Sequence, residues 1–396
     1  MYILRESWVR VRRNNGSVGI DGMRIEDVEL YGVDRYLEEL REDLRQQTYR
    51  PEEVKRKLIE KANGKTRPLG IPTVRDRIAQ TACLLVLEPI FEADFDESSY
   101  GFRPERSTKG AIREIKEQLQ KGNTTTYDAD LSQYFDTIPH SKLMIALKER
   151  ITDPRILRLI KKWLKAPVKD GNKMTGGKSN HLGTPQGGVI SPLLANIYMN
   201  LLDRIVNNTQ SLFGVSGVKM IRYADDFVLM GKIITTDVKD QLHHLLTRMD
   251  LVLNIEKTEH IDAKEASFTF LGFTFRNDKD LYGRDLRYIN IVPNSDSEKK
   301  LRWKISDYLK RRGHKNPTDL VRGLNSLVRG WINYYEIRGV TNTSVSKRKL
   351  RYYLSHKLFR YYRRKSQRRC RHYGPNTFET LVRYYGLIDP TQYHPC

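Results

Sequence analysis

The sequence is poor in cysteine and contains no long hydrophobic run. Its three cysteines, Cys83, Cys370 and Cys396, are far apart in a chain of 396 residues. Three widely spaced cysteines do not make a disulfide framework or a tetrahedral zinc set. No apolar stretch approaches the ~20 residues that a membrane span needs, and the opening segment MYILRESWVRVRR lacks the apolar core of a signal peptide. We therefore expect a cytoplasmic protein with no membrane partner.

Acidic residues are too few to balance the basic ones, and the deficit lies mainly at one end. The net charge is +22, and residues 281–396 hold 26 Lys and Arg against 8 Asp and Glu. A local surplus of this size favours a polyanion partner, because cations release counterions from phosphates. A basic surface that only keeps the protein soluble is the alternative. We favour nucleic acid.

Hydrophobic periodicity divides the chain into an α+β part and a helical, basic part. The segment VKRKLIEKANGKTRPLGIP predicts a hairpin that turns at Asn63–Gly64, and a helix is expected over 74–91. The segment SPLLANIYMNLLDRIVNN predicts a helix capped by Ser191. From about residue 296 onward the apolar spacing is helical.

Two adjacent aspartates, Asp225 and Asp226, stand between the apolar runs VKMIRY and FVLM. The runs predict a hairpin with the acids at its tip. A divalent cation would neutralise the pair, since Mg²⁺ prefers one or two carboxylates with water and substrate phosphates. Two ions near a third carboxylate could align an attacking hydroxyl and stabilise a leaving pyrophosphate. Aspartate is also common in ordinary turns, so the dipeptide alone does not decide.

The segment YDADLSQYF offers a third carboxylate at the end of a predicted strand. Asp128 and Asp130 have the same strand parity, so their spacing leaves both candidates open. The segment GTPQGGVISPLL adds a glycine-rich loop before the predicted helix, and glycine permits close approach of the backbone to a ligand. Such loops are also routine in structures without a ligand.

Together and in this order, these segments resemble the sequence blocks of reverse transcriptases. The matching blocks are DLSQYFDTI, GTPQGGVISPLLANIYM, IRYADDFVLM and FLGFTF. RPLGIPTVRDR and SSYGFRPERS resemble the group II intron-encoded branch, and LVRGWINYY resembles its maturase domain. The resemblance implies an α+β right-hand polymerase. It would comprise an N-terminal extension (1–55), fingers and palm (56–280), an all-α three-helix thumb (281–345) and a basic helical tail that binds nucleic acid (346–396).

The resemblance also selects one of the two strand aspartates. It implies that Asp130, Asp225 and Asp226 hold two Mg²⁺ ions, for which Mn²⁺ could substitute. The backbone carbonyl of Leu131 would join the metal shell.

A nucleotide site is implied as well. Phe135 would crowd a ribose 2′-hydroxyl, and Gln186 would lie beside the nucleotide and the templating base. Lys61, Lys65 and Arg67 would hold the triphosphate, for which arginine offers a planar fork. A buried core position for the phenylalanine, and solvated hairpin positions for the cations, are the plainer alternatives.

The primer and the RNA have expected contacts too. Tyr223 and Ala224 would support the primer end, and Leu271 and Gly272 of FLGF would form the primer grip. The polar loop NNGSVGIDGM would lie over the template. Interleaved tyrosines near the end of the chain could stack on unpaired bases, although a solvated helix face shows the same pattern. The side chains expected to bind RNA or DNA are Arg322, Arg329, Lys347, Arg348, Lys349, Arg351, Arg363 and Arg364.

The expected reaction is DNA synthesis from dNTPs on an RNA template and a DNA primer, by a monomer or a homodimer. The protein would also bind a structured group II intron RNA to assist splicing, and a target DNA. CRHYGPN offers one Cys and one His without a second pair at ligand spacing, so no endonuclease is expected. The alternatives are a domesticated enzyme of DNA repair or phage defence, a splicing chaperone without polymerase activity, and an RNA-making or DNA-templated polymerase.

Overall fold

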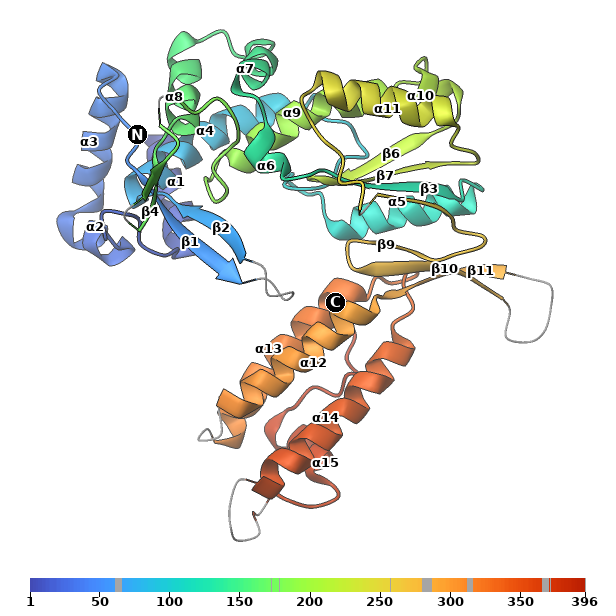
Figure 1. Cartoon of the computed structure of the whole chain (residues 1–396). Helices are drawn as coiled ribbons and strands as arrows, with labels where there is room; N and C mark the ends of the chain where they lie inside the picture. Colours follow the sequence, from blue (N-terminus) through green and yellow to red (C-terminus); the bar gives the residue numbers. More distant parts are fainter. Residues whose placement is uncertain are drawn as a thin grey trace. The chain divides into compact units, whose positions relative to one another are not determined.

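The computed structural model describes residues 1–60, 66–171, 173–177, 179–256, 258–279, 287–311, 316–364, 370 and 372–395. The chain divides into two compact units (Figure 1). The first contains residues 1–111 and 127–259, and the second contains residues 112–126 and 260–396. Helix α5 (Thr108–Gln120) and strand β3 (Thr125–Asp130) cross the division. No described helix is both long and apolar enough to cross a membrane.

The first unit begins with a group of helices. Helix α1 (Tyr2–Asn14) packs on α4 (Val74–Glu92), α3 (Val33–Gln46) lies beside α1, and α2 (Ile25–Tyr31) packs on α3. The predicted N-terminal extension is therefore part of this unit. Helix α4 confirms the helix expected over 74–91, and the Thr73 side chain caps it by accepting from the Asp76 amide.

The predicted first hairpin is confirmed by its strand pairing. Strands β1 (Val54–Glu60) and β2 (Thr66–Ile71) are antiparallel, with Glu60 opposite Thr66. Its turn at 63–64 lies outside the described residues. The sheet order is β2-β1-β4-β5, where β4 (Val168–Asp170) runs parallel to β1 and β5 (Lys173–Thr175) closes the edge. Helices α6 (Tyr134–Thr137), α7 (His140–Lys148) and α8 (Pro154–Leu164) connect β3 to β4.

A second sheet, in the order β6-β7-β3-β8, carries the aspartate hairpin. Strands β6 (Lys219–Tyr223) and β7 (Asp226–Gly231) pair antiparallel as predicted, and the apolar run of β7 is fully buried. Helices α9 (Ser191–Val206), α10 (Leu212–Val215) and α11 (Thr236–Arg248) complete this part of the chain. Strand β8 (Glu259–Asp262) ends the sheet.

Helix α9 is confirmed, but its predicted cap is wrong. The N-cap residue is Ile190, and Ser191 is the first helical residue. The Ser191 hydroxyl donates to the Pro185 carbonyl at 2.8 Å, so it does not cap the helix amides. Buried side chains occur on nearly every side of α9, whereas Ile205 is 41% exposed.

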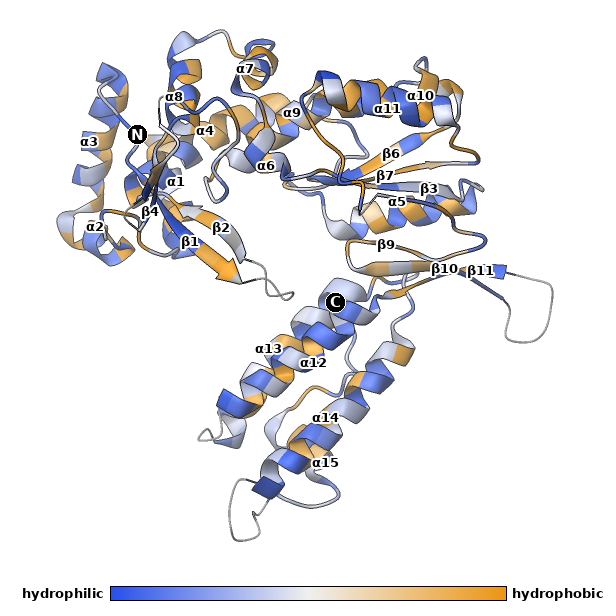
Figure 2. Ribbon diagram, in the orientation of Figure 1, coloured by the Kyte–Doolittle hydropathy of each residue, from blue (hydrophilic) through white to orange (hydrophobic). Residues whose placement is uncertain are grey.

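In its described residues from 268 onward, the second unit combines a small sheet with four helices. The sheet order is β11-β10-β9, formed by β9 (Phe268–Phe270), β10 (Phe273–Lys279) and β11 (Arg287–Pro293). The helices are α12 (Ser295–Arg311), α13 (Pro317–Tyr335), α14 (Ser344–Arg364) and α15 (Thr377–Tyr385). Figure 2 shows hydrophilic and hydrophobic residues alternating along these helices, as expected when one stripe of each is buried.

The predicted boundary between thumb and tail at 345/346 is wrong. Helix α14 is continuous across it, and α14 packs on both α12 and α15. Its buried stripe of Leu350, Leu354 and Leu358 belongs to the core of this unit. The third helix of the bundle is therefore α14, and the bundle continues into α15.

The turn between β9 and β10 predicts a stability difference between two glycines of this unit. Gly272 has φ +81°, and a Cβ there would lie 2.7 Å from the Tyr335 hydroxyl, whereas a Cβ on Gly330 of α13 would meet open space. Gly272→Ala should lower the free energy of unfolding by about 1–2 kcal/mol. Gly330→Ala should raise it by roughly 0.5–1 kcal/mol, because alanine favours a helix interior. Urea unfolding of both variants checks the two signs, and equal effects would contradict the turn geometry.

Candidate active site

The backbone brings the candidate acids onto neighbouring strands of one sheet. Asp130 is the last residue of β3, Asp226 is the first of β7, and these strands are adjacent. Asp225 precedes β7 in the turn, where Tyr223 pairs with Asp226. Asp225 is half-buried and Asp226 is exposed. The predicted location of Asp225 and Asp226 at a hairpin tip is confirmed.

Asp128 belongs to the same acidic neighbourhood. Burial, together with the negative charges of Asp226, Glu259 and Asp130, raises the pKa of the Asp128 carboxyl to about 7. This effect shows that Asp130 and Asp226 are close enough to act on a common neighbour. The Asp130 carboxylate accepts a hydrogen bond from the Asn254 amide at 3.3 Å, and its carbonyl accepts from the Asn254 N–H at 2.8 Å.

The donor atoms suit a hard divalent cation, because carboxylate oxygens are the ligands that Mg²⁺ prefers. Within the part of the chain that the structure describes, no three or more His, Cys, Asp or Glu side chains form a group that could hold a metal ion as they stand. Three carboxylates repel one another, so converging on one point is unfavourable without a positive charge between them. Leu131, whose carbonyl was expected to join them, is buried directly after β3.

Phe135 lies on α6, with its ring in an aromatic cluster. The ring packs edge-on against Phe102 at 6.4 Å and against Tyr134 at 5.5 Å between centroids. Phe135 is 9% exposed, whereas Phe102 is 55% exposed and has φ +55°. No role is predicted for Phe102 from the sequence, although it lies in SSYGFRPERS, one of the blocks that resemble the group II intron-encoded branch.

Gln186 is fixed at the edge of a cleft. Its side-chain amide donates to the Asp136 carboxylate at 2.7 Å, and its backbone carbonyl accepts from the Gly70 amide of β2 at 2.6 Å. The cleft has a volume of about 230 Å³, and Arg56 and Thr184 also line it. A Cβ on Gly187 would lie 2.1 Å from the Gly70 carbonyl, so this loop requires glycine there.

Most of the residues predicted to bind the triphosphate lie outside the part of the chain that the structure describes. Lys61 and Lys65 lie outside the described residues. Only the backbone of Arg67 is described, in β2 opposite Ile59. Their roles stay predictions.

The residues expected to contact the primer occupy two tight turns. In the first unit, Ala224 is buried with φ +59° and Tyr223 is half-buried. In the second unit, Leu271 and Gly272 both have positive φ, and the Tyr334 hydroxyl donates to the Leu271 carbonyl at 3.0 Å. The FLGF segment is therefore an ordered hairpin turn supported by α13.

One predicted nucleic-acid contact is wrong. Lys347 is only 3% exposed, and its ammonium donates to the Glu336 carboxylate at 2.8 Å and to the Tyr393 carbonyl at 2.6 Å. A lysine enclosed in this way is not available to a phosphate. Arg351 is exposed but pairs with Asp389 at 3.0 Å and with Glu379 at 3.4 Å, so it joins α14 to α15 and the segment after it.

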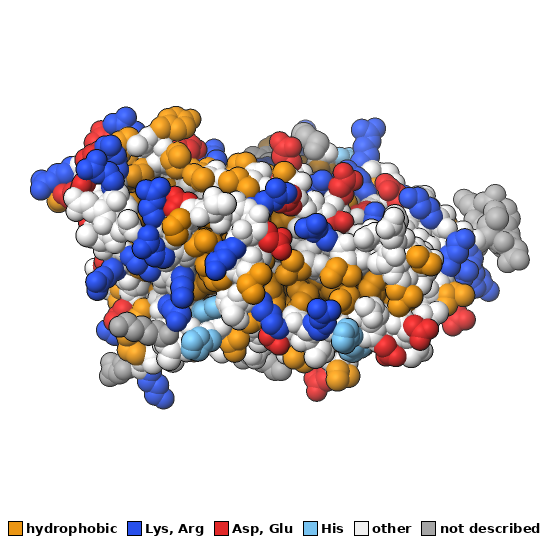
Figure 3. Space-filling view, turned by 90° about the horizontal axis from the view of Figure 1, so that it is seen from above, with side chains coloured by type: hydrophobic (Ala, Val, Ile, Leu, Met, Phe, Trp, Pro, Cys, Tyr) orange, Lys and Arg blue, Asp and Glu red, His pale blue; other side chains and the backbone are white. Residues whose placement is uncertain are grey.

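The other predicted basic contacts are exposed on the helices. Arg322 pairs with Asp319 at 3.3 Å. A cleft of about 420 Å³ between α12 and α14 adds further cations, and it is lined in part by Lys310, Lys357, Arg360 and Tyr361. Elsewhere, on the face that Figure 3 shows from above, basic side chains are interspersed with apolar patches. The exposed predicted residues are Arg322, Arg329, Arg348, Lys349, Arg351, Arg363 and Arg364.

Comparisons with known proteins identify two regions. A family model described as reverse transcriptase (RNA-dependent DNA polymerase) matches residues 59–275. A model of the group II intron maturase-specific domain matches residues 298–374, and so also crosses the predicted boundary at 345/346.

Curated relatives share both long and short segments with this chain. Protein YkfC of Escherichia coli (strain K12) is 37% identical over 309 residues, which cover 68% of this chain and 80% of YkfC. The group II intron-encoded protein LtrA of Lactococcus lactis subsp. cremoris is 40% identical over 166 residues, covering 42% of this chain and 27% of LtrA. An uncharacterized 91 kDa protein in the cob intron of Schizosaccharomyces pombe is 42% identical over 163 residues, covering 41% and 20%.

The loop that carries Gln186 predicts a pH dependence. The His140 ring bonds to the Gly183 carbonyl at 2.7 Å, and burial lowers the pKa of His140 below its usual value. A depressed histidine pKa means that the unfolded state takes up its proton at a higher pH, about 6.5, than the folded state does. The wild-type protein should therefore lose stability between pH 7.5 and 5.5 relative to His140→Gln, by up to about 1 kcal/mol. Chemical unfolding across this range checks the difference, and parallel curves would contradict it.

Proposed function

This chain belongs to the reverse transcriptase family and carries the maturase-specific domain of group II intron proteins. On that premise we propose which of its residues act in catalysis and which bind the nucleotide and the nucleic acids. Its activity is RNA-directed DNA polymerisation, as an intron-encoded reverse transcriptase and maturase. The observation that supports our assignment of the active site is the placement of Asp130 and Asp225–Asp226 at the ends of adjacent strands.

Divalent metal ions are general to enzymes of this family. We assign two Mg²⁺ ions, replaceable by Mn²⁺, to the carboxylates of Asp130, Asp225 and Asp226 and the Leu131 carbonyl. Bound there, the ions would polarise the primer hydroxyl and neutralise the leaving pyrophosphate. The oxygen donors at the ends of β3 and β7 fit that demand.

The protein's own residues select and orient the nucleotide. Phe135 presents its ring edge to Phe102, and a ribose 2′-hydroxyl would collide with this aromatic pair. Gln186, oriented by Asp136, would lie beside the base pair being formed. The β1–β2 hairpin would bring Lys61, Lys65 and Arg67 to the triphosphate. Tyr223 and Ala224 would support the primer end, and Leu271 and Gly272 would form the primer grip.

Several partners follow from these assignments. The RNA template, DNA primer and dNTPs meet at the acids, and the basic helices bind the structured intron RNA and the target DNA. We retain Arg322, Arg329, Arg348, Lys349, Arg351, Arg363 and Arg364 as contacts, and we place the complex in the cytoplasm as a monomer or a homodimer.

The domains are an extension (1–55), fingers and palm (56–280), and a thumb that begins at 281 and continues through α14 and α15. An RNA-making polymerase is disfavoured by the aromatic pair.

The acid assignment predicts separate effects on synthesis and RNA binding. Asp225→Asn should lower primer extension at least 1,000-fold, because a metal ligand is lost, and leave intron RNA binding within twofold. Asp237→Asn, at the exposed start of α11, serves as a control that should retain activity. Purified Asp225→Asn that still extends a primer would refute the metal role.

The aromatic pair predicts relaxed sugar selection. Phe135→Val should raise kcat/KM for rNTPs relative to dNTPs roughly 10- to 100-fold, the range that a small change in pocket size is worth. Single-nucleotide extension with matched dNTP and rNTP measures the ratio. Unchanged exclusion of rNTPs would assign the ring to core packing alone.

Two adjacent basic residues provide a matched test of RNA binding. Lys347→Met should destabilise the protein by about 1–3 kcal/mol, because Glu336 loses its buried partner, without changing the salt dependence of RNA binding. Exposed Arg348→Met should leave stability within about 0.5 kcal/mol and lower the log–log salt slope by about one unit. The reverse pattern would restore Lys347 as an RNA contact and remove Arg348.

A further inference from the structure

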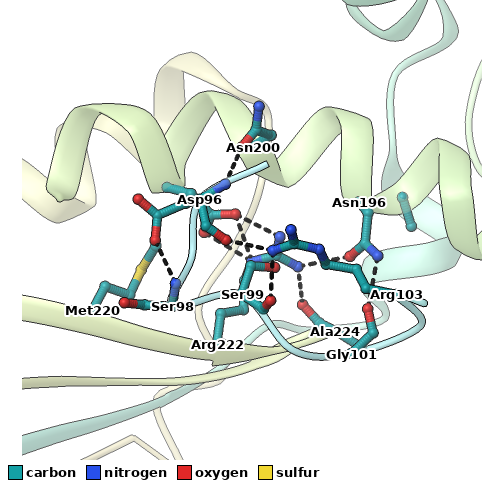
Figure 4. A network of polar contacts seen from close by, with 12 residues as sticks. Asp96, Ser98, Ser99, Gly101, Arg103, Asn196, Asn200, Met220, Arg222 and Ala224 are labelled. Carbon is teal, nitrogen blue, oxygen red and sulfur yellow. Dashed lines mark hydrogen bonds and ion pairs between the residues drawn. The ribbon is translucent and has the colours of Figure 1, made fainter. Parts of the chain in front are cut away.

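We propose that Arg222 is a positioning residue that holds the turn bearing Asp225 and Asp226 in its working conformation, together with Asn196 and Gly101. We call these three residues the Ala224 clamp, since each lies against the backbone of Ala224 or holds a residue that does (Figure 4). The proposal rests on the role assigned above to the two aspartates. It adds residues that touch neither substrate nor metal and act through the turn.

Arg222 is an unusual residue for its place in the fold. It lies one residue pair before the β6–β7 turn, opposite Phe227, and is 1% exposed. Its charge is compensated by Asp203 of α9, to which Nε donates at 2.8 Å and Nη2 at 2.5 Å. A buried ion pair adds little stability over an apolar pair of the same size, because both charges must be desolvated. A role in specifying one geometry accounts for this pair better than stability does.

The remaining nitrogen of the guanidinium reaches the turn. Nη1 donates to the Ala224 carbonyl at 2.8 Å and to the Asn196 side-chain oxygen at 3.0 Å. Ala224 has φ +59°, a left-handed conformation that is unfavourable for a residue with a Cβ. Because Ala224 immediately precedes Asp225, its backbone angles set the direction of both aspartates. The bond to its carbonyl therefore stabilises the conformation that aims them.

The opposite side of the turn is held by a close backbone contact. A Cβ on Gly101 would lie 2.3 Å from the Ala224 amide nitrogen and 3.0 Å from its Cα. The Asn196 side chain donates to the Gly101 carbonyl at 2.7 Å, and the Tyr100 amide donates to the Arg222 carbonyl at 2.9 Å. The position of Gly101 therefore leaves no room for a side chain, because the Ala224 backbone lies against it. Asn196 bridges the two halves of the clamp.

The segment that carries Gly101 is itself anchored. Arg103 is buried, donates to the Ser99 carbonyl at 2.7 Å and pairs with Glu92 of α4 at 2.7 Å. Between Gly101 and Arg103 lies Phe102, whose ring meets that of Phe135. One set of contacts thus locates both the turn that bears the acids and the aromatic pair assigned to the sugar.

Two substitutions perturb the turn from opposite sides. Arg222→Lys keeps a positive charge near Asp203 but removes the planar fork that reaches Ala224. Gly101→Ala adds one methyl group against the Ala224 backbone. Gly214→Ala is the matched control, since its Cβ would also lie 2.3 Å from a backbone atom, the Asn208 carbonyl oxygen. Gly214 lies in α10, near the start of β6, whereas the turn follows the end of β6.

The experiment measures single-nucleotide extension by the full chain on a DNA primer and RNA template. Both clamp variants should lower kcat at least tenfold and raise the Mg²⁺ concentration for half-maximal rate at least threefold. The KM for dNTP and the Kd for primer–template should stay within twofold, because no group that binds them is removed. Gly214→Ala should lower the Tm without changing kcat or the Mg²⁺ requirement.

The outcomes separate this proposal from the one on which it rests. Wild-type kcat and Mg²⁺ dependence in both clamp variants, alongside an inactive Asp225→Asn, would overturn the clamp alone. Activity in Asp225→Asn would overturn the metal assignment as well. An equal loss of kcat in Gly214→Ala at a matched drop in Tm would reduce the clamp to general stability. Should Arg222→Lys fail to fold, Gly101→Ala and Asn196→Ala decide, since both retain the Arg222–Asp203 pair.

Discussion

The buried ion pair between Arg222 and Asp203 is the interaction on which the first unit's site depends. It joins strand β6 to helix α9 in a place from which water is excluded. Separating the two charges there would leave each of them buried without compensation, which costs free energy. Bringing several carboxylates to one sheet edge creates repulsion that tends to push the turn outward. A planar cation just beneath the turn opposes that tendency and still leaves the aspartates at the surface.

Much of this arrangement is predictable from local patterns in the sequence. Apolar runs locate the β6–β7 hairpin, and helical spacing locates α4 and α9, although both helices bury polar as well as apolar side chains. The position of the acids at a hairpin tip follows from the same pattern. Family resemblance, rather than spacing, distinguishes Asp130 from Asp128, and the structure places both in one electrostatic neighbourhood.

The errors share a physical origin, which is that a side chain's partner depends on tertiary contacts. Ser191 was expected to cap a helix, yet its hydroxyl donates to a carbonyl six residues earlier. Lys347 was grouped with exposed cations, although Glu336 and Tyr393 enclose it. The boundary predicted at 345/346 separates the thumb from the basic tail. The continuous buried stripe of α14 carries the fold across that point, because helices are delimited by packing and not by charge.

Helix α9 has a buried face that an ordinary amphipathic reading would assign to solvent. Asn196, Asn200 and Asp203 recur at helical spacing along it, and each bonds to a loop or strand brought from elsewhere in the first unit. Replacing these three residues with leucine is expected to keep the neighbouring segments packed on α9 through apolar contacts. Their positions along the helix would no longer be fixed, because leucine forms no directional hydrogen bonds.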